Sequence, residues 1–544
     1  NYRELRADLE RQGVVFRGGS DTEVLANLLA REGRACLPKL NGIFAFAAWY
    51  PAERRLLLAR DAAGVKPLYW ASTAQGRVFA SELKSFRDVK GIDWSLDHVA
   101  VTAYLTLLYA PGELTPAKGV RKLPPGSYLE WSAEGGTQSG AFVPPHYSEE
   151  IQPFTDRQAA EACRHYIGQA VKRQLVSDVP LGGFLSGGVD SSAIAHFACA
   201  ELGDASRYPC FTVGSADLDG LSSEGFAEDH PYAVLMARRL GTPLHDAVLR
   251  EAALTDLDAM VWTLDEPTAD VAAFAAHAVC REARERGVKV LLSGSGGDDL
   301  FTGYRRHVAL RYERYWDWAP RPLRAMLRRS VSGLKASSPA GRRLGKLFRY
   351  ADAEPAERLA AYFLWISQDT LAPALSPELR ESLGVDRPVD QLLRSLDGLP
   401  EGVSRLNQML HLDRAHFLAD HNLNYTDKMA MACGVEVRLP FLDPDLVAFS
   451  ERLADGRKIR GTDSKRVLRQ SLQGILPEEV LTRSKAGFGL PLRQLLHGAY
   501  GTRLRELARS GRLDATGLFS GPGVIALLDA DARGEIDAAY PLLA

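Results

Sequence analysis

The sequence predicts an α/β protein with two parts: a first α+β part, and a second part built on a doubly wound parallel sheet with a helical C-terminal region. Short alternating apolar stretches bounded by turn residues dominate residues 1–139, which is typical of strands paired in hairpins. From residue 156, apolar strand-like runs alternate with helical segments, which favours parallel βαβ units. The stretch 140–153, with its adjacent prolines, separates these patterns, so we expect domains at 1–150 and 151–544.

The first part is expected to be rich in strands with interleaved helices. Either Ser20 or Asp21 is a good N-cap for one of these helices. The expected elements, in order, are a helix at 1–9, a short strand at 14–16, a helix from residue 21, a β-hairpin made of 40–49 and 54–60, and strands at 69–70 and 78–80. The turn residues Pro51-Ala-Glu53 separate the two strands of the hairpin.

The second part alternates strands and helices before it becomes entirely helical. The expected strands are 181–185, 210–214, 245–249 and 288–293, and the expected helices between or before them are 156–176, 193–202, 232–240, 254–264 and 272–286. Further helices are expected at 305–327, 355–366, 406–417 and 443–453. Ligands of such sheets bind beyond the carboxyl ends of the strands, so the loops there are the candidate sites.

A glycine-rich loop, Ser186-Gly-Gly-Val-Asp-Ser191, follows the first of these strands. Glycines let backbone N–H groups approach an anion closely, and the N-terminus of the following helix adds the positive end of its dipole. Asp190 can hold a divalent cation that bridges phosphate oxygens. No Gly-Lys-Ser/Thr follows the glycines, so the loop differs from the usual P-loop although it suits a polyphosphate.

A second glycine turn, Ser293-Gly-Ser-Gly-Gly-Asp-Asp299, follows the last expected strand. Its paired carboxylates, Asp298 and Asp299, suit Mg²⁺ and the placement of charge beside a reacting acyl phosphate. Lys485 stands beside another glycine-rich turn, where a fixed cation could stabilise leaving pyrophosphate. Val213, near the end of its strand, is expected beside a nucleobase.

The composition is that of an ordinary globular protein. The chain has 544 residues, 25% of them charged, and a formal net charge of −2, which argues against nucleic acid or membrane as a partner. The arginine-rich stretch 321–329 is interpreted as the solvated face of a helix. Six scattered cysteines without a C-x-x-C pair indicate reduced thiols and a cytoplasmic protein, and no apolar run is long enough to span a bilayer.

The first part carries six motifs in a fixed order: Ser-Asp-Thr-Glu at 20–23, Leu-Asn-Gly-Ile-Phe-Ala-Phe at 40–46, Ala-Arg-Asp at 59–61, Gly-Val-Lys-Pro-Leu-Tyr at 64–69, Phe-Ala-Ser-Glu-Leu-Lys at 79–84 and Leu-Pro-Pro-Gly at 123–126. This order resembles the glutaminase domain of glutamine-hydrolysing asparagine synthetases. The resemblance implies an N-terminal-nucleophile fold in which a leading cysteine attacks glutamine. It also implies that Asp21 binds the α-amino group of that glutamine, and that Cys36 is not catalytic.

The family's nucleophile belongs before the first residue of this sequence. Either those residues precede Asn1 in the full protein, or the protein never had a working glutaminase. We expect the first, because a half-domain would expose sheet edges and apolar faces.

The second part resembles the synthetase domain of the same family, a PP-loop ATP pyrophosphatase. The match continues through Asp427-Lys-Met-Ala-Met431, residues 434–443, and the islands 463–465 and 483–491. The resemblance implies an ATP site made of Leu185, Ser186, Gly187, Gly188, Asp190, Ser191, Val213, Ser293 and Gly294, with Asp190 and Asp298 sharing Mg²⁺. It implies that Lys485, Asp298 and Asp299 are catalytic, that Lys465 is a weaker candidate, and that Glu436 and Arg438 are structural anchors.

Two departures leave the acceptor open. Many relatives carry an acidic residue where this chain has Ser295, and glutamate is common where it has Asp299. We expect a glutamine-dependent ligase that activates a carboxylate, most readily aspartate, as an acyl-adenylate, with ATP, glutamine and the acid as its small-molecule partners. The alternatives are a relative that amidates another acid or closes a ring, and a degenerate nucleotide-binding protein without turnover. A homodimer is a further expectation.

Overall fold

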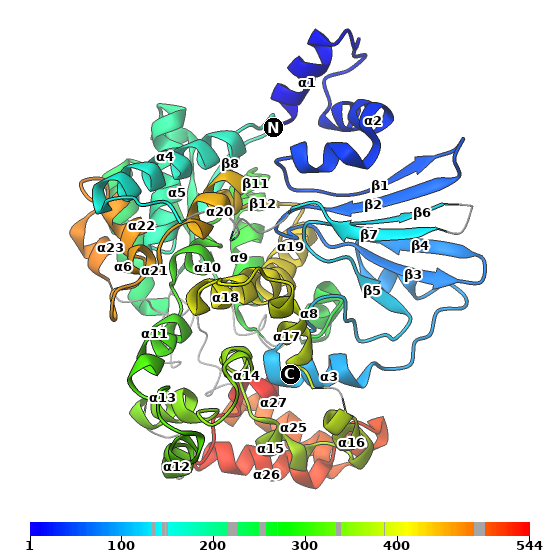
Figure 1. Cartoon of the computed structure of the whole chain (residues 1–544), viewed down its shortest axis with the longest axis vertical. Coiled ribbons are helices and arrows are strands. Elements are labelled where there is room, and N and C mark those ends of the chain that lie inside the picture. The colour runs from blue at the N-terminus through cyan, green and yellow to red at the C-terminus, as the bar shows by residue number, and fades with distance from the viewer. Residues whose placement is uncertain are drawn as a thin grey trace.

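The computed structural model of the chain describes residues 1–132, 136–143, 147, 151–214, 226–249, 257–268, 270–332, 339–385, 387–483 and 496–544. Figure 1 shows antiparallel strands on one side of the molecule, and a parallel sheet wrapped in helices on the other. The predicted fold class, with its α+β first part and its helical C-terminal part, is confirmed.

The first part is a sandwich of two antiparallel sheets. One sheet has the order β1 (Ala45–Tyr50), β2 (Arg55–Arg60), β6 (Ser127–Trp131), β7 (Thr137–Ala141), and the other β4 (Gly76–Ala80), β3 (Tyr69–Thr73), β5 (Val120–Lys122). Leu58 and Trp131 of the first sheet share a core with Trp70 of the second sheet and with Leu68, which precedes β3. The helices α1 (Tyr2–Arg11) and α2 (Asp21–Glu32) pack together next to the first sheet (Figure 1). Ser20 is the N-cap of α2, because its side chain accepts the backbone N–H of Glu23.

The short strand predicted at 14–16 is wrong. These residues are not in a strand, and a strand needs a neighbour with which to exchange backbone hydrogen bonds. Phe16 instead packs with the helices, and the guanidinium of Arg6 lies 4.4 Å from the centre of its ring. Val14 and Phe16 therefore serve the core under α1 and α2, whereas Val15 is exposed.

The second part is built on a parallel sheet with the order β10 (Leu244–Val248), β9 (Cys210–Gly214), β8 (Leu181–Phe184), β11 (Val290–Leu292), β12 (Glu436–Arg438). Helices α4 (Asp156–Gln174), α5 (Val189–Leu202) and α6 (Phe226–Leu240) contribute to the core on one face. Helices α9 (Ala272–Glu285) and α19 (Leu423–Ala432) contribute to the core on the other. The chain leaves β8 toward β9 but returns on the other side as β11, so the strand order reverses between β8 and β11.

The helical region departs from prediction in three places, the first of which is the helix expected at 355–366, which ends at Ala361. The single helix expected at 305–327 is three pieces: α11 (Arg305–Tyr312), a 3₁₀ turn (Glu313–Tyr315) and α12 (Arg321–Ser332). Pro320 and Pro322 disfavour helical geometry in the residues before them, which separates the pieces. The helix expected at 406–417 is α18 (Arg405–Leu412), which continues as a π-helix (Asp413–Asn422) into α19. π-helical turns often occur at functional sites.

The second part contains further helices outside its sheet core. They include α8 (Leu257–Leu264), α10 (Gly297–Phe301), α13 (Pro339–Phe348), α14 (Pro355–Ala361), α17 (Asp390–Asp397), α20 (Pro444–Glu451), α22 (Arg466–Ser471), α25 (Ala499–Arg509) and α26 (Gly521–Ala532). Over the described ranges, no helix is both long and apolar enough to cross a membrane.

Lys458 gives the fold a pH dependence. Its ammonium group is buried and donates to Asn407 Oδ1 at 2.6 Å, and burial lowers the pKa of Lys458 to about 7. In the unfolded chain the pKa returns toward 10.5, so between pH 7 and 10.5 the unfolded state binds more protons. This lysine therefore destabilises the fold at pH 7, and that cost is relieved as the pH rises.

We predict that the free energy of unfolding of the wild type rises with pH relative to that of Lys458→Met, by up to about 1.4 kcal/mol per pH unit between pH 7 and 10. Denaturant unfolding across this range measures the difference. Lys90→Met, at an exposed lysine, should track the wild type. Parallel curves for the wild type and Lys458→Met would contradict the prediction.

Candidate nucleotide site and the interface between the domains

The two glycine loops meet at the point where the strand order reverses. The loop after β8 leads into α5, and the loop after β11 leads into α10. Because β8 and β11 are adjacent and parallel, both loops leave the same edge of the sheet. The residues predicted for ATP in these loops, Leu185, Ser186, Gly187, Gly188, Asp190, Ser191, Ser293 and Gly294, therefore lie together. Val213 is the last residue but one of the neighbouring strand β9, near the same edge.

Two glycines in the loops leave no room for a side chain, one against α6 and one against the other loop. Gly187 has φ +70°, and a Cβ there would lie 2.5 Å from the backbone N of Ala233. A Cβ on Gly294 would lie 2.7 Å from the backbone N of Ser191, in the other glycine loop. The absence of side chains lets the backbone of both loops form one cradle.

Hydroxyl groups and backbone N–H groups line this cradle. The Ser186 and Ser191 Oγ atoms are 3.1 Å apart, and the backbone N–H of Ser186 donates to Ser191 Oγ at 3.2 Å. In the second loop, the Ser293 and Ser295 Oγ atoms are also 3.1 Å apart. The 14-residue helix α5 begins directly at the loop, so its positive dipole end faces the same space. This chemistry fits a phosphate chain.

Asp190 and Asp298 share one lysine. Lys465 Nζ lies 2.5 Å from Asp190 Oδ2 and 2.5 Å from Asp298 Oδ1. Burial alone would lower the pKa of Lys465, but the two carboxylates outweigh it, so the pKa is raised and the ammonium stays charged. Lys465 also has φ +54°, and its backbone N–H donates to Phe301 O at 3.0 Å. A non-glycine residue in this conformation costs energy, which marks a position held by its surroundings.

The structure thus gives Lys465 a more central position than the sequence suggested. Its only signal in the sequence was the short motif 463–465, far along the chain from either loop. Lys485, the lysine predicted to be catalytic, lies outside the described residues, as does the whole island 484–491.

The carboxylates of Asp190 and Asp298 are also suitable ligands for Mg²⁺. Hard oxygen donors are what this ion prefers, and it would bind through one or two carboxylates together with substrate phosphates. The donor set of this chain therefore fits the ion that the sequence predicted, with Lys465 holding the two carboxylates in register.

Asp299 faces a different network. Its carboxylate accepts the hydroxyl of Tyr304 at 3.3 Å. The backbone N–H of Tyr304 donates to His307 Nδ1 at 3.1 Å, so the other ring nitrogen of His307 carries the proton that is shared with Asp413 Oδ2 at 2.6 Å. This chain of contacts fixes the second glycine loop to the start of the π-helix.

The remaining predicted residues lie elsewhere. Asp21 is exposed in the first turn of α2, in the other part of the molecule, where its carboxylate accepts the backbone N–H of Thr22 at 2.8 Å (Figure 1). Arg438 bonds Glu436 at 2.7 Å and the carbonyl oxygens of Gln174 and Val176, each at 2.7 Å. These contacts tie β12 to the end of α4, which is the anchoring role expected of the pair.

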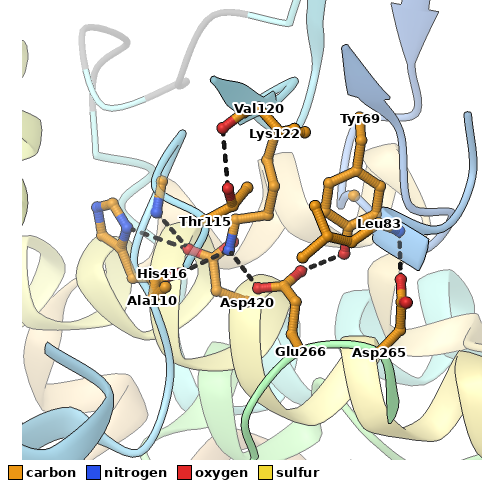
Figure 2. Close-up of polar contacts among 12 residues, drawn as sticks. Tyr69, Leu83, Ala110, Thr115, Val120, Lys122, Asp265, Glu266, His416 and Asp420 are labelled. Carbon is orange, nitrogen blue, oxygen red and sulfur yellow. Dashed lines mark hydrogen bonds and ion pairs between the residues drawn. The ribbon is translucent and has the colours of Figure 1, made fainter. Parts of the chain in front are cut away.

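A buried polar network that the sequence did not predict joins the two parts (Figure 2). Lys122, from β5, donates to Ala110 O at 2.6 Å and lies 3.4 Å from Asp420 and 3.6 Å from Glu266. Tyr69, from β3, donates its hydroxyl to Glu266, and Lys428 donates to the Tyr69 hydroxyl at 3.1 Å. The two acidic residues stand together in the sequence as Asp265-Glu266-Pro267, and both carboxylates face the first part.

Asp265 is held in a strained conformation by the first part. It has φ +64°, and its carboxylate accepts the backbone N–H groups of Leu83 and Lys84, the latter at 2.7 Å. Burial raises the pKa of Asp265, against the effect of nearby Lys428. These bonds are available only when the first part is docked, so docking supports the strained residue.

A small cavity of about 10 Å³ lies within this interface. It is lined by Arg60, Pro67, Leu68, Tyr69 and Lys122 of the first part and by Ala419, Asp420 and Asn424 of the second. This volume admits a molecule about the size of water. Asp420 Oδ1 is buried at this cavity and forms its ion pair with Lys122 Nζ at 3.4 Å.

Family models match both parts of the chain. A model described as asparagine synthase matches residues 162–544, and one described as a glutamine amidotransferase domain matches residues 1–142. The chain belongs to the asparagine synthase family. The predicted resemblance and the predicted ligase class are therefore confirmed at the level of the family.

Individual relatives align over most of the chain. A Mycobacterium tuberculosis protein with the provisional name of glutamine-hydrolysing asparagine synthetase is 34% identical over 518 residues, covering 92% of this chain and 76% of the relative. A Bacillus subtilis protein named glutamine-hydrolysing asparagine synthetase 1 is 30% identical, covering 95% and 78%. A Penicillium rubens protein named amidase chyE is 24% identical, covering 92% and 77%.

We predict that Gly187→Ala lowers nucleotide-dependent activity about 100-fold, because the added methyl group displaces the loop by roughly an ångström. ATP–pyrophosphate exchange measures the loss. Gly456→Ala is the matched control, since a Cβ there meets no atom within 4 Å. Equal activities in the two variants would contradict the close contact between the loop and the backbone N of Ala233 in α6.

Proposed function

We propose that this family member makes an amide by activating a carboxylate with ATP, through an acyl-adenylate, with release of pyrophosphate and AMP. The observation that carries the proposal is the junction of the two glycine loops with the Asp190–Lys465–Asp298 cluster. A carboxylate is a poor electrophile, and adenylation provides a leaving group whose charge a preorganised site can stabilise. Mg²⁺, held by Asp190 and Asp298, would neutralise phosphate charge in this reaction.

The roles of the chain's own residues follow from their chemistry. Backbone N–H groups of both loops and the hydroxyls of Ser186 and Ser191 bind phosphate oxygens. Lys465 keeps two carboxylates at one place, and Lys485 is proposed as the cation that stabilises the departing pyrophosphate. Val213 is proposed to lie against the adenine. Asp298 is proposed to complete the acidic edge of the site, and Asp299 is proposed to act behind it, through its contact with the Tyr304 hydroxyl.

Nitrogen is proposed to come from glutamine, hydrolysed in the first domain, where Asp21 would hold the α-amino group. The small cavity lies between the two parts and has room for one molecule of about the size of ammonia, which supports transfer across this interface. We also propose that the two domains meet near residue 150. The enzyme is proposed to work in the cytoplasm as a homodimer.

The acceptor acid is proposed to be aspartate, by analogy with the named synthetases. A second candidate is the same chemistry on another acid. Ser295 favours this alternative, because it places a neutral hydroxyl where relatives often carry a negative charge. This hydroxyl lies in the second loop, 3.1 Å from Ser293 Oγ. The fungal relative named amidase chyE also aligns with nearly the whole chain under a different name.

ATP–pyrophosphate exchange with a panel of carboxylates tests the chemistry directly. We expect exchange with aspartate or with one other acid, and a loss of about 100-fold or more in Asp190→Ala, which leaves Lys465 without one of its two carboxylates. Asp178→Ala, at an exposed aspartate, is the matched control. Exchange at the wild-type rate in Asp190→Ala would refute the assigned site, and silence with every acid would favour a protein without turnover.

Coupling between the parts is tested by Lys122→Met in the full-length protein. We expect glutamine-dependent amide formation to fall about ten-fold more than ammonium-dependent formation, because two buried carboxylates lose their shared cation at the interface. Lys118→Met, at an exposed lysine on the same part, is the control. An equal loss with both nitrogen donors would indicate a general structural defect instead, and thermal unfolding of the variant identifies that outcome.

A further inference from the structure

The segment 305–349 concentrates positive charge within a nearly neutral protein. It contains thirteen lysines and arginines but two acidic residues, whereas the whole chain carries a formal net charge of −2. Both acids face other groups of the protein: Glu313 is 3% exposed and lies 3.1 Å from Arg358, and Asp317 pairs with the same arginine. The net charge of the chain therefore conceals a strongly basic region.

Large apolar side chains are exposed in the same region. Six of the seventeen exposed large hydrophobic side chains of the described residues fall within it, namely Tyr312 (43% exposed), Tyr315 (60%), Trp318 (78%), Leu323 (50%), Met326 (61%) and Leu344 (43%). Leu323 and Met326 stand three residues apart on α12, so they share one face of that helix. The rings of Tyr312 and Tyr315 lie side by side at a tilt of 40°, with their centres 6.1 Å apart. We call these six side chains the α12 face.

Exposed arginines stand among these side chains in the sequence, and the guanidinium of Arg314 lies 4.6 Å from the centre of the Tyr315 ring. Arg314, Arg321, Arg328 and Arg329 are all exposed, and Arg328 also lies 3.2 Å from Asp352. Helices α12 and α13 pack against each other and form a corner of the molecule, at the lower left of Figure 1, opposite α1 and α2. In this view α12 therefore lies at the outer edge of the molecule.

We propose that the α12 face docks on an anionic lipid surface and holds the enzyme at a membrane. Apolar side chains on one helix face, accompanied by arginines and joined by tryptophan and tyrosine, are the features of helices that lie in the plane of a lipid interface. The arginines meet lipid phosphates and carboxylates, while Trp318, Leu323 and Met326 enter the boundary with the acyl chains. This binding is peripheral and goes beyond the amide chemistry proposed above.

Charge distinguishes this occupant from a second copy of the chain. A two-fold contact would place the same arginines against each other, and like charges in contact oppose association. Single-stranded RNA would satisfy the arginines and could stack on Tyr315 and Trp318, but it would leave Leu323, Met326 and Leu344 without an apolar partner. A lipid boundary satisfies both classes of side chain.

The test is co-sedimentation of the full-length protein with vesicles. We expect binding to vesicles of phosphatidylcholine mixed with phosphatidylserine, little binding to phosphatidylcholine alone, and weaker binding at high salt. Each arginine near an anionic surface contributes about five-fold to partitioning, so Arg321→Glu with Arg328→Glu should lose more than ten-fold, as a rough lower bound. Trp318→Ser with Met326→Ser should also lose binding while the fold is retained, since both side chains are exposed.

The matched control carries the same charge change at the opposite end of the molecule. Arg11→Glu with Arg31→Glu, on α1 and α2, should bind vesicles as the wild type does. Bromine on the acyl chains should quench fluorescence in the wild type more than in Trp318→Phe. Equal binding of the α12-face variants and the control variant would overturn the proposal, as would binding to single-stranded RNA or to polyglutamate with none to anionic vesicles. Quenching that is the same in Trp318→Phe would overturn it as well.

Discussion

The candidate site depends on one shared cation. Asp190 and Asp298 come from different loops, and two carboxylates so close together repel each other unless a positive charge is placed between them. Lys465 supplies that charge from the end of the segment before α22, far along the chain from both loops. The sheet, the second loop and the helical region must therefore be folded together before the phosphate cradle exists. The site belongs to the whole second part and not to the PP-loop alone.

The same physics acts where the two parts meet. Lys122 of the first part balances Glu266 and Asp420 of the second, while the hydroxyl of Tyr69 links Glu266 to Lys428. Removing one member of such a buried set costs more than the set gains by forming, because the remaining charges are left without partners. A network of this kind specifies one docking geometry, since hydrogen bonds and ion pairs are directional where apolar contacts are not. Fixed docking is what transfer of a small molecule between two sites requires.

Local patterns predicted the elements well because strands, hairpins and caps depend on nearby residues. The hairpin around residues 51–53, the alternation of the second part and the N-cap at Ser20 all follow from such patterns. The strand expected at 14–16 failed because pairing depends on a neighbour that local sequence does not specify. The π-helix (Asp413–Asn422) and the position of Lys465 were also missed, since both arise from packing between distant segments. The glycine loops could be predicted as a site because each carries its chemistry within a few consecutive residues.

The order of strands in the parallel sheet has a consequence for how the chain is made. β11 is complete at Leu292, but its neighbour β12 begins at Glu436, more than a hundred residues later. At a synthesis rate of about 5–20 residues per second, β11 waits on the order of ten seconds with one edge unpaired. An open strand edge invites pairing with another chain during that interval. Nascent chains of this enzyme should therefore need protection by chaperones until β12 has left the ribosome. When the protein is overproduced, unfinished chains should aggregate more than finished chains unfold.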